Sequence, residues 1–217
     1  MSNRRTLSPQ QRRQRNRNEV IAAMVEAARQ IMRQHGVAAL NLNEIARAVG
    51  MQTPSLYEYF PNKLALYDYL FRLGIRDMRA RLDAVTAPTE PTAPAWNEVE
   101  RYLTAYVEWA VENPDFFKLL FERHIPGFTP SDESMAEMYA EVEAGQRQLE
   151  ALLRAAHLDP GIPLQQAFDV FLILQHGITA LHLANSPDLP VGQGRFTILI
   201  SFVVNMMKTA WQHAEEK

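Results

Sequence analysis

The sequence predicts an all-α protein of about nine helices, arranged as a small N-terminal unit of three helices followed by a larger helical unit. Apolar residues recur at the three- and four-residue spacing of amphipathic helices along most of the chain. Glycine and proline residues stand between these periodic segments, as expected at helix ends. With 217 residues, the chain is long enough to bury a substantial core.

Charge is distributed unevenly along the chain. Residues 1–81 contain fourteen Lys and Arg against six Asp and Glu, whereas residues 82–217 contain eight against nineteen. The net charge of −3 therefore hides a basic N-terminal part, which suits a polyanionic partner. The chain has no cysteine, which excludes disulfides and thiolate metal sites. We expect neither a signal peptide nor a membrane-spanning helix, and hence a cytoplasmic protein.

The first helix is expected from a stripe of apolar residues that ends at Gly36: Val20, Met24, Ala27, Ala28 and Ile31. The preceding segment is a basic arm, in which Ser8 and Gln11 could cap a helix that begins early. Its arginines are Arg4, Arg5, Arg12, Arg13, Arg15 and Arg17. Two interpretations of the arm remain open: it contacts phosphates or the minor groove of DNA, or it is a solvated, partly disordered tail.

Two short helices joined by a tight turn are expected next. Asn41 and Glu44 are spaced as a capping box for the first of them, and Gly50 follows its last turn. The second helix can begin at Thr53, with Pro54 at its first position. A short helix, a glycine turn and a second helix with a polar face form a helix-turn-helix, whose second helix enters the major groove of DNA.

An aromatic-rich run ends this stretch. The run Ile45-Ala46, Gly50 and Leu56-Tyr57-x-Tyr59-Phe60-x-x-Lys63 resembles the DNA-binding domain of the TetR family, and the resemblance covers roughly residues 17–65. It implies a DNA-binding domain over residues 1–65 and a ligand-binding and dimerisation domain over residues 66–217. A His-Gly pair in the penultimate helix resembles one subgroup of the family, and otherwise the second domain is similar in helical character and length.

The resemblance and the polar face of the second short helix indicate the candidate DNA contacts. Base edges are expected to meet Gln52, Thr53 and Ser55, with an apolar contact from Pro54. Phosphates are expected to meet Tyr57, Tyr59 and Lys63. The candidate DNA contacts also include Asn41 and Asn43. Glu58 departs from the pattern because its carboxylate repels phosphate.

The remaining helices are expected from apolar periodicity and breakers. A helix capped by Asn62 should run from Lys63 to about Ala84, with a solvated outer face made by Arg72, Arg76, Arg79 and Arg81. Residues 87–94 contain three prolines and predict a linker. Further helices are expected at about residues 96–112, 116–124, 131–157, 164–185 and 194–214.

The last two of these helices are apolar on all sides, so they should be buried on all sides. A unit of this size cannot cover both, and one side of each should meet another chain in a two-fold four-helix bundle. TetR-like proteins usually dimerise through their last two helices, so the resemblance agrees. The candidate homodimer contacts are Leu172, Leu199, Val203 and Met207.

Aromatic residues gather on the helices of the larger unit, and two interpretations remain open. They are simple core, or they line a cavity for a small apolar molecule. The candidate lining is Tyr106, Trp109, Phe117, Phe121, Tyr139, Phe171, Gln175 and His176. For His176, burial against a satisfying neighbour competes with a ligand contact. Because the aromatic lining has no Lys or Arg, the expected effector is apolar and uncharged or cationic.

The sequence therefore predicts a transcription regulator that binds double-stranded operator DNA as a homodimer. It should be a repressor released from a pseudo-palindromic operator by a small ligand. No enzymatic activity, cofactor or metal is expected, because the chain has no nucleophile motif and no metal-ligand spacing. The alternatives are a helical small-molecule-binding or enzymatic protein without a DNA role, and an architectural DNA-binding protein without an effector.

Overall fold

The structure, a computed structural model, describes residues 8–86, 95–122, 125–155 and 158–212. In these ranges all regular secondary structure is helical, which confirms the predicted fold class. The elements are α1 (Pro9–His35), the 3-10 turn η1 (Val37–Ala39), α2 (Leu42–Ala48), α3 (Thr53–Leu56), α4 (Lys63–Thr86), α5 (Ala95–Glu112), α6 (Pro114–Phe117), the π-helical η2 (Lys118–Glu122), α7 (Asp132–Ala155), α8 (Leu164–Asn185), the 3-10 turn η3 (Thr197–Leu199) and α9 (Ile200–Gln212).

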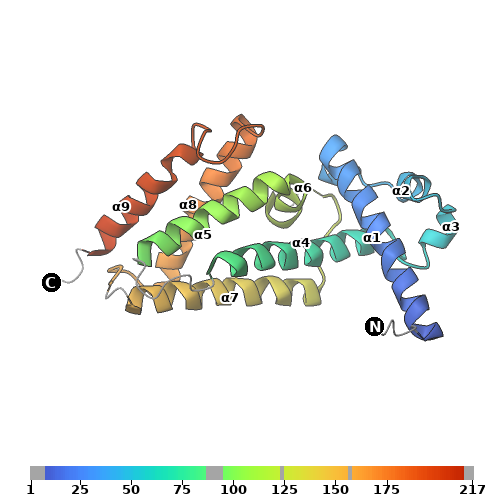
Figure 1. Cartoon of the computed structure of the whole chain (residues 1–217), viewed down its shortest axis with the longest axis horizontal. Coiled ribbons are helices and arrows are strands. Elements are labelled where there is room, and N and C mark those ends of the chain that lie inside the picture. The colour runs from blue at the N-terminus through green and yellow to red at the C-terminus, as the bar shows by residue number, and fades with distance from the viewer. Residues whose placement is uncertain (1–7, 87–94, 123–124, 156–157, 213–217) are drawn as a thin grey trace, which may run out of the picture.

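The molecule is elongated. Figure 1 shows α1, α2 and α3, here called the head, at one end of the long axis. Helix α4 leads from the head into the bundle, which consists of α4, α5, α7, α8 and α9, and α8 and α9 lie away from the head. Arg4, Arg5 and the linker predicted at residues 87–94 lie outside the described residues.

The helix ends of the head follow local sequence signals. Ser8 and Gln11 exchange both hydrogen bonds of a capping box, so the basic arm is helical from Pro9. Asn41 caps α2 by accepting a hydrogen bond from the backbone of Asn43, and not through the predicted box with Glu44. Gly50 adopts φ = 67°, the left-handed conformation that glycine takes without a steric penalty.

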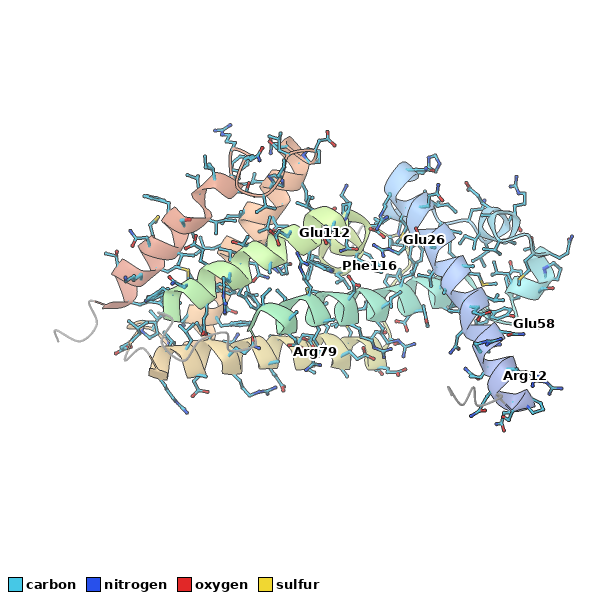
Figure 2. The ribbon with its side chains drawn as sticks, in the orientation of Figure 1. Arg12, Glu26, Glu58, Arg79, Glu112 and Phe116 are labelled. Atoms are coloured by element: carbon cyan, nitrogen blue, oxygen red, sulfur yellow. The ribbon has the colours of Figure 1, made fainter. Side chains whose placement is uncertain are left out.

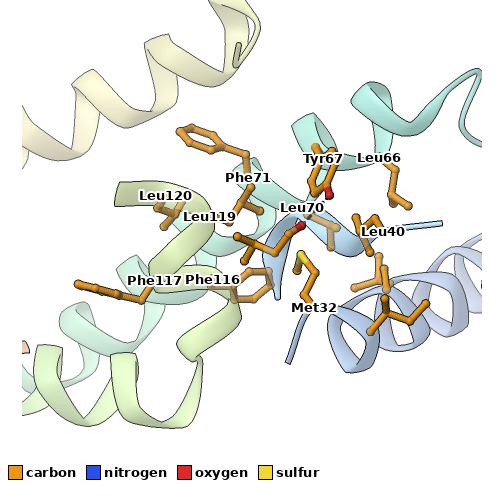
Figure 3. Packing of buried hydrophobic residues seen from close by; sticks show 14 of the residues in the cluster. Met32, Leu40, Leu66, Tyr67, Leu70, Phe71, Phe116, Phe117, Leu119 and Leu120 are labelled. Carbon is orange, nitrogen blue, oxygen red and sulfur yellow. Dashed lines mark hydrogen bonds between the residues drawn. The ribbon is translucent and has the colours of Figure 1, made fainter. Parts of the chain in front are cut away.

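One core joins the head to α4 and α6. Ile45 and Leu56 are fully buried in it, together with Leu70 of α4. Figure 3 shows Met32 of α1, Leu70 of α4 and Phe116 of α6 pointing toward one another. Because this core crosses residue 65, the start of α4 packs as part of the head, and the domain boundary at that residue stays a prediction.

A second core lies between α5, α7, α8 and α9, where Leu103, Phe168 and Ile200 are buried. Within the described residues, α8 is the helix whose length and apolar composition would also fit a membrane span. A core helix passes the same test, and one face of α8, including Phe168 and Ile178, is buried in this core.

Two helices of the larger unit differ from the prediction. The helix expected from Pro114 and Phe116 to about residue 124 begins at Pro114 as predicted, but after Phe117 it widens into the π-helical η2. The last helix was expected from residue 194, but α9 begins at Ile200. In the loop before it, Gly194 packs directly on His182: a Cβ at Gly194 would lie 2.5 Å from His182 Nδ1. The same imidazole lies 3.1 Å, through Nε2, from the carbonyl oxygen of Leu189.

The arginines of α4 pair with carboxylates on α7 and α5 while Arg76 and Arg79 stay exposed, so the predicted solvated face is also a contact between helices. Three pairs follow each other along α4 and α7, and Figure 2 shows Arg79 between these helices. They are Arg72–Glu133 at 2.7 Å, Arg76–Glu137 at 2.6 Å and Arg79–Glu141 at 2.8 Å, and Arg81 pairs with Glu108 of α5 at 2.9 Å. Since half-exposed pairs contribute about 0.2–1 kcal/mol each, their main effect is to fix the register of α7 on α4.

Asp68 of α4 also holds the start of α7. Its carboxylate accepts from the backbone N–H of Ser131 at 2.8 Å and from the hydroxyl of Ser134 at 2.7 Å. Burial alone would raise the pKa of Asp68, but the hydrogen bonds from these serines outweigh it and lower the pKa. An ionised side chain of α4 therefore satisfies donors in the first turn of α7.

Candidate nucleic-acid interface and ligand site

The predicted DNA contacts lie on and around α3, at the outer edge of the head (Figure 1). The backbone here is fixed by Leu56, which is fully buried, and by Phe60, which packs on Tyr69 with the ring centres 5.4 Å apart. With this apolar side held inside, the polar side chains face outward. Exposed are Asn41, Asn43, Gln52, Pro54, Tyr57 and Lys63, and half-buried are Thr53, Ser55 and Tyr59.

Several of these side chains also have local roles. The side-chain oxygen of Asn41 is occupied by the cap of α2, at 2.9 Å from the backbone nitrogen of Asn43. Lys63 is the first residue of α4, and its ammonium lies 5.9 Å from the centre of the Tyr67 ring. Glu58 lies exposed at the same end of the molecule (Figure 2).

A contact between α1 and the turn after α3 was missed by sequence analysis. The guanidinium carbon of Arg17 lies 4.7 Å from the centre of the Tyr59 ring, a cation–π geometry. The composition indicated that Arg17 belongs to a basic arm, but the contact joins residues distant in sequence, and no local pattern reveals it. The arm is thus anchored beside a predicted phosphate contact.

Six of the eight predicted ligand residues come together at His176 of α8: Tyr106, Trp109, Phe117, Phe121, Gln175 and His176 itself. The ring of His176 lies 4.5 Å from that of Phe121, 5.7 Å from that of Tyr106 and 6.1 Å from that of Phe117, measured between centres. Trp109 packs on Tyr106 at 6.0 Å. We call these residues the His176 cluster.

The polar groups of the His176 cluster are weakly partnered. The hydroxyl of Tyr106 lies 3.4 Å from His176 Nδ1, a long hydrogen bond. Gln175 is only 3% exposed, and no donor among the described residues meets hydrogen-bond geometry at its side-chain oxygen. Burial lowers the pKa of His176 and raises that of Tyr106, which the neighbouring Gln175 partly offsets. At neutral pH, these groups are therefore uncharged donors and acceptors in apolar surroundings.

Two predicted lining residues do not join the His176 cluster. Tyr139 is 60% exposed on α7, so its assignment to a buried lining is wrong. Phe171 is buried in the second core, where its ring lies 5.8 Å from that of Tyr102. Burial raises the pKa of Tyr102 to about 12.

A separate cavity of about 220 Å³ lies between α4, η2 and the segment before α7. It is lined by Phe71, Leu119, Ile125, Phe128, Thr129 and Pro130. Among the described residues, no group of three or more His, Asp and Glu side chains is arranged to hold a metal ion.

The predicted dimer contacts fall on different sides of their helices. Leu199 is 46% exposed, and Leu172 and Val203 are half-buried. Met207 is 5% exposed and packs inside its own chain, so its placement on the outer face is wrong. The side chains that form an exposed apolar stripe are instead Val170, Ile173 and Leu181 of α8, and Ile198, Leu199, Phe202 and Met206 of η3 and α9.

Two family models match this chain, one in its N-terminal part and one in its C-terminal part. Residues 24–70 match the family described as "Bacterial regulatory proteins, tetR family", and residues 99–197 match "Tetracyclin repressor-like, C-terminal domain". The chain belongs to the TetR family. Regulators of the TetR family are generally not enzymes.

Curated relatives agree with TetR-family membership. The chain is 31% identical over 120 residues to the HTH-type transcriptional regulator Mb1846 of Mycobacterium bovis, and equally to Rv1816 of Mycobacterium tuberculosis. The match covers 54% of this chain and 50% of the relatives, so the chain spans about half the length of the curated relatives it matches.

Solved structures share the TetR fold at low sequence identity. The putative regulatory protein SCO4313 is 20% identical, with a TM-score of 0.72 over 89% of this chain and 97% of its own. FadR of Bacillus subtilis, in complex with stearoyl-CoA, is 13% identical, with a TM-score of 0.65 over 87% of this chain and 98% of its own. These likenesses establish the fold.

Proposed function

We propose that this TetR-family chain is a sequence-specific DNA-binding transcription regulator, a repressor released from its operator by a small apolar ligand. The observation that carries the proposal is the surface around α3, where Gln52 and Tyr57 are exposed and Thr53 and Ser55 are half-buried, while Leu56 and Phe60 fix the helix from inside. The basic charge of residues 1–81 and the names of the curated relatives support it. Gln52 and Ser55 contact base edges, and Tyr57 and Lys63 contact phosphates.

The operator-binding form is a homodimer that pairs through α8 and α9. The exposed apolar side chains of α8 and of α9 favour burial against a second copy. Ile173, Gly177 and Leu181 are spaced by four along α8, and Gly177 has open space where a side chain would be. That position lets a partner helix approach closely.

The effector binds at the His176 cluster, where Gln175 and His176 offer polar groups within an aromatic surrounding. The absence of Lys and Arg from this cluster favours an uncharged or cationic apolar compound. Phe121 belongs to η2, which directly follows α6, and α6 is bound to α1 through Asp115. Displacement of η2 by a ligand would therefore be transmitted to the head, and DNA and ligand would weaken each other's binding by the same factor.

Selection of bound sequences from a random duplex pool tests the DNA role. The wild-type chain should select a two-fold symmetric site. Gln52→Ala should relax the preference at particular base pairs, whereas Lys63→Ala should weaken all sequences alike. Lys118→Ala, which removes an exposed lysine of the bundle, is the control and should change neither. A pool that shows no enrichment would overturn the proposed function.

The effector assignment is tested by titrating uncharged and cationic apolar compounds, with stearoyl-CoA as the anionic comparison. One compound should raise the melting temperature and lower operator affinity, and Phe121→Ala should reduce both effects. Tyr139→Ala, at an exposed position of α7, is the control. A response to the acyl-CoA alone would contradict the predicted effector class and leave the DNA role intact.

A further inference from the structure

The basic segment at the start of α1 is not accounted for by the core. Residues 9–19 form an N-terminal extension of α1, ahead of the part that packs in the core of the head, and every one of them is exposed. At 1.5 Å per residue, this extension is about 16 Å long. It contains four arginines and one glutamate. Because it buries no apolar side chain, its charge and not its packing indicates what it does.

The arginines of this extension lie on two faces. Arg13 and Arg17 are four residues apart and therefore share one face of the helix. Arg15 lies on the other side, where its guanidinium pairs with Glu19 at 3.4 Å. Within the described residues, Arg13 has no ion pair, so the Arg13–Arg17 face keeps its positive charge while the opposite face is partly neutralised.

The Arg13–Arg17 face is continuous with the candidate nucleic-acid interface. Arg17 lies over the ring of Tyr59, which follows α3 by three residues. From there, the face leads outward along α1, and Arg13 lies about 6 Å further along the helix axis. Figure 2 shows Arg12, on the same exposed extension, and Glu58, beside α3, at the same end of the molecule.

We propose that the Arg13–Arg17 face of α1 binds the sugar–phosphate backbone of the operator duplex, beside the groove that α3 enters. The proposal rests on the proposed function. Charge complementarity and continuity with α3 favour this partner, because a guanidinium donates two parallel hydrogen bonds to a phosphate. Since backbone contacts carry no base information, the extension adds affinity to every sequence alike and orients the head on DNA.

The test compares Arg13→Gln with Arg15→Gln in the full chain on one selected duplex. Each variant removes one positive charge from an exposed position and keeps a good helix former, so neither should change the fold. The dissociation constant is measured between about 50 and 200 mM salt. Across this range, the loss of one phosphate contact makes the salt-induced weakening of binding about 3.5-fold smaller. Arg13→Gln should show this smaller weakening. Arg15→Gln should show less than half of the change that Arg13→Gln shows.

Three results would overturn the proposal. Equal reductions in both variants would mean that only the total charge matters, and no reduction in either would mean that the extension is a solvated tail. A change in the selected sequence with Arg13→Gln would assign that residue to bases and not to the backbone. Failure of the proposed function is distinguishable, because the wild-type chain would then select no duplex at all.

Discussion

Asp115 of α6 links the head to the rest of the molecule through two ion pairs. Its fully buried carboxylate accepts from Arg29 at 2.7 Å and from Arg33 at 3.0 Å, both on α1. The Arg29 guanidinium also stacks on Phe116, 3.9 Å from the ring centre. Gly74 of α4 allows this approach, since a Cβ there would lie 3.1 Å from the Phe116 ring. One carboxylate thus fixes α1 against α6.

Removal of one partner should be costly at this site. Arg29→Gln should lower the free energy of unfolding by about 1.5–3 kcal/mol, because it removes buried hydrogen bonds to a charged group while Arg33 still pairs with Asp115. Arg33→Gln is the matched control and should cost less, since Arg33 is 38% exposed and Arg29 is 14% exposed. Urea unfolding followed by circular dichroism measures both values. Equal losses would contradict the view that Arg29 is the main partner.

His176 should make stability depend on pH. Burial lowers its pKa in the folded state below the ordinary value of 6.5, so the unfolded chain binds the proton first as the pH falls. The stability that neutral His176 contributes is present above pH 6.5 and is lost as the pH falls toward the lower folded-state pKa. Between about pH 7.5 and 5.5, wild type should therefore lose more unfolding free energy than His176→Gln. Parallel losses would contradict the burial of this ring.

At single positions, the sequence predicted local chemistry better than tertiary orientation. Caps and turns such as Ser8, Asn62 and Gly50 depend on near neighbours in the chain, and the structure confirms them. Met207 was misplaced because its helix is apolar on most sides, so periodicity does not indicate which side faces inward. Tyr139 was misplaced because the sequence does not show whether an aromatic side chain on a helix packs against another helix or faces solvent.

At the scale of elements, apolar periodicity predicted which segments are helical, but it did not predict irregular helix geometry. The sequence of the π-helical η2, KLLFE, contains no helix breaker and gives no local signal of the widening. The ion pairs between α4 and α7 could have been found, since Arg72, Arg76 and Arg79 and their glutamates recur at matching helical spacings. That signal requires knowledge that the two helices are neighbours.

The exposed stripe on α8 and α9 should control assembly. Phe202→Asp should convert a dimer into monomers, because an unpaired carboxylate in an apolar interface costs several kcal/mol. Phe202 is 60% exposed in one chain, so the substitution does not disrupt that chain's own core. Gln148→Asp, at an exposed position of α7, is the charge control. Light scattering distinguishes the outcomes, and a wild-type monomer would contradict the dimer.

For the whole molecule, the division into a basic head and an acidic bundle was predictable from charge and composition. The way the two are connected was not, because the Asp115 pairs and the shared core bring together residues more than eighty positions apart. The structure joins the head to the bundle through both α4 and α6. A change near η2 can therefore reach α1 by a route that sequence patterns do not contain.

The central claim is that two heads recognise one duplex in a sequence-specific manner. The most direct measurement is the affinity of the full chain for three duplexes of equal length: one with both selected half-sites, one with a single half-site scrambled, and one with both scrambled. Affinity should fall at each step, with the last duplex bound at least about a thousandfold more weakly than the first. Equal affinity for all three duplexes would contradict it.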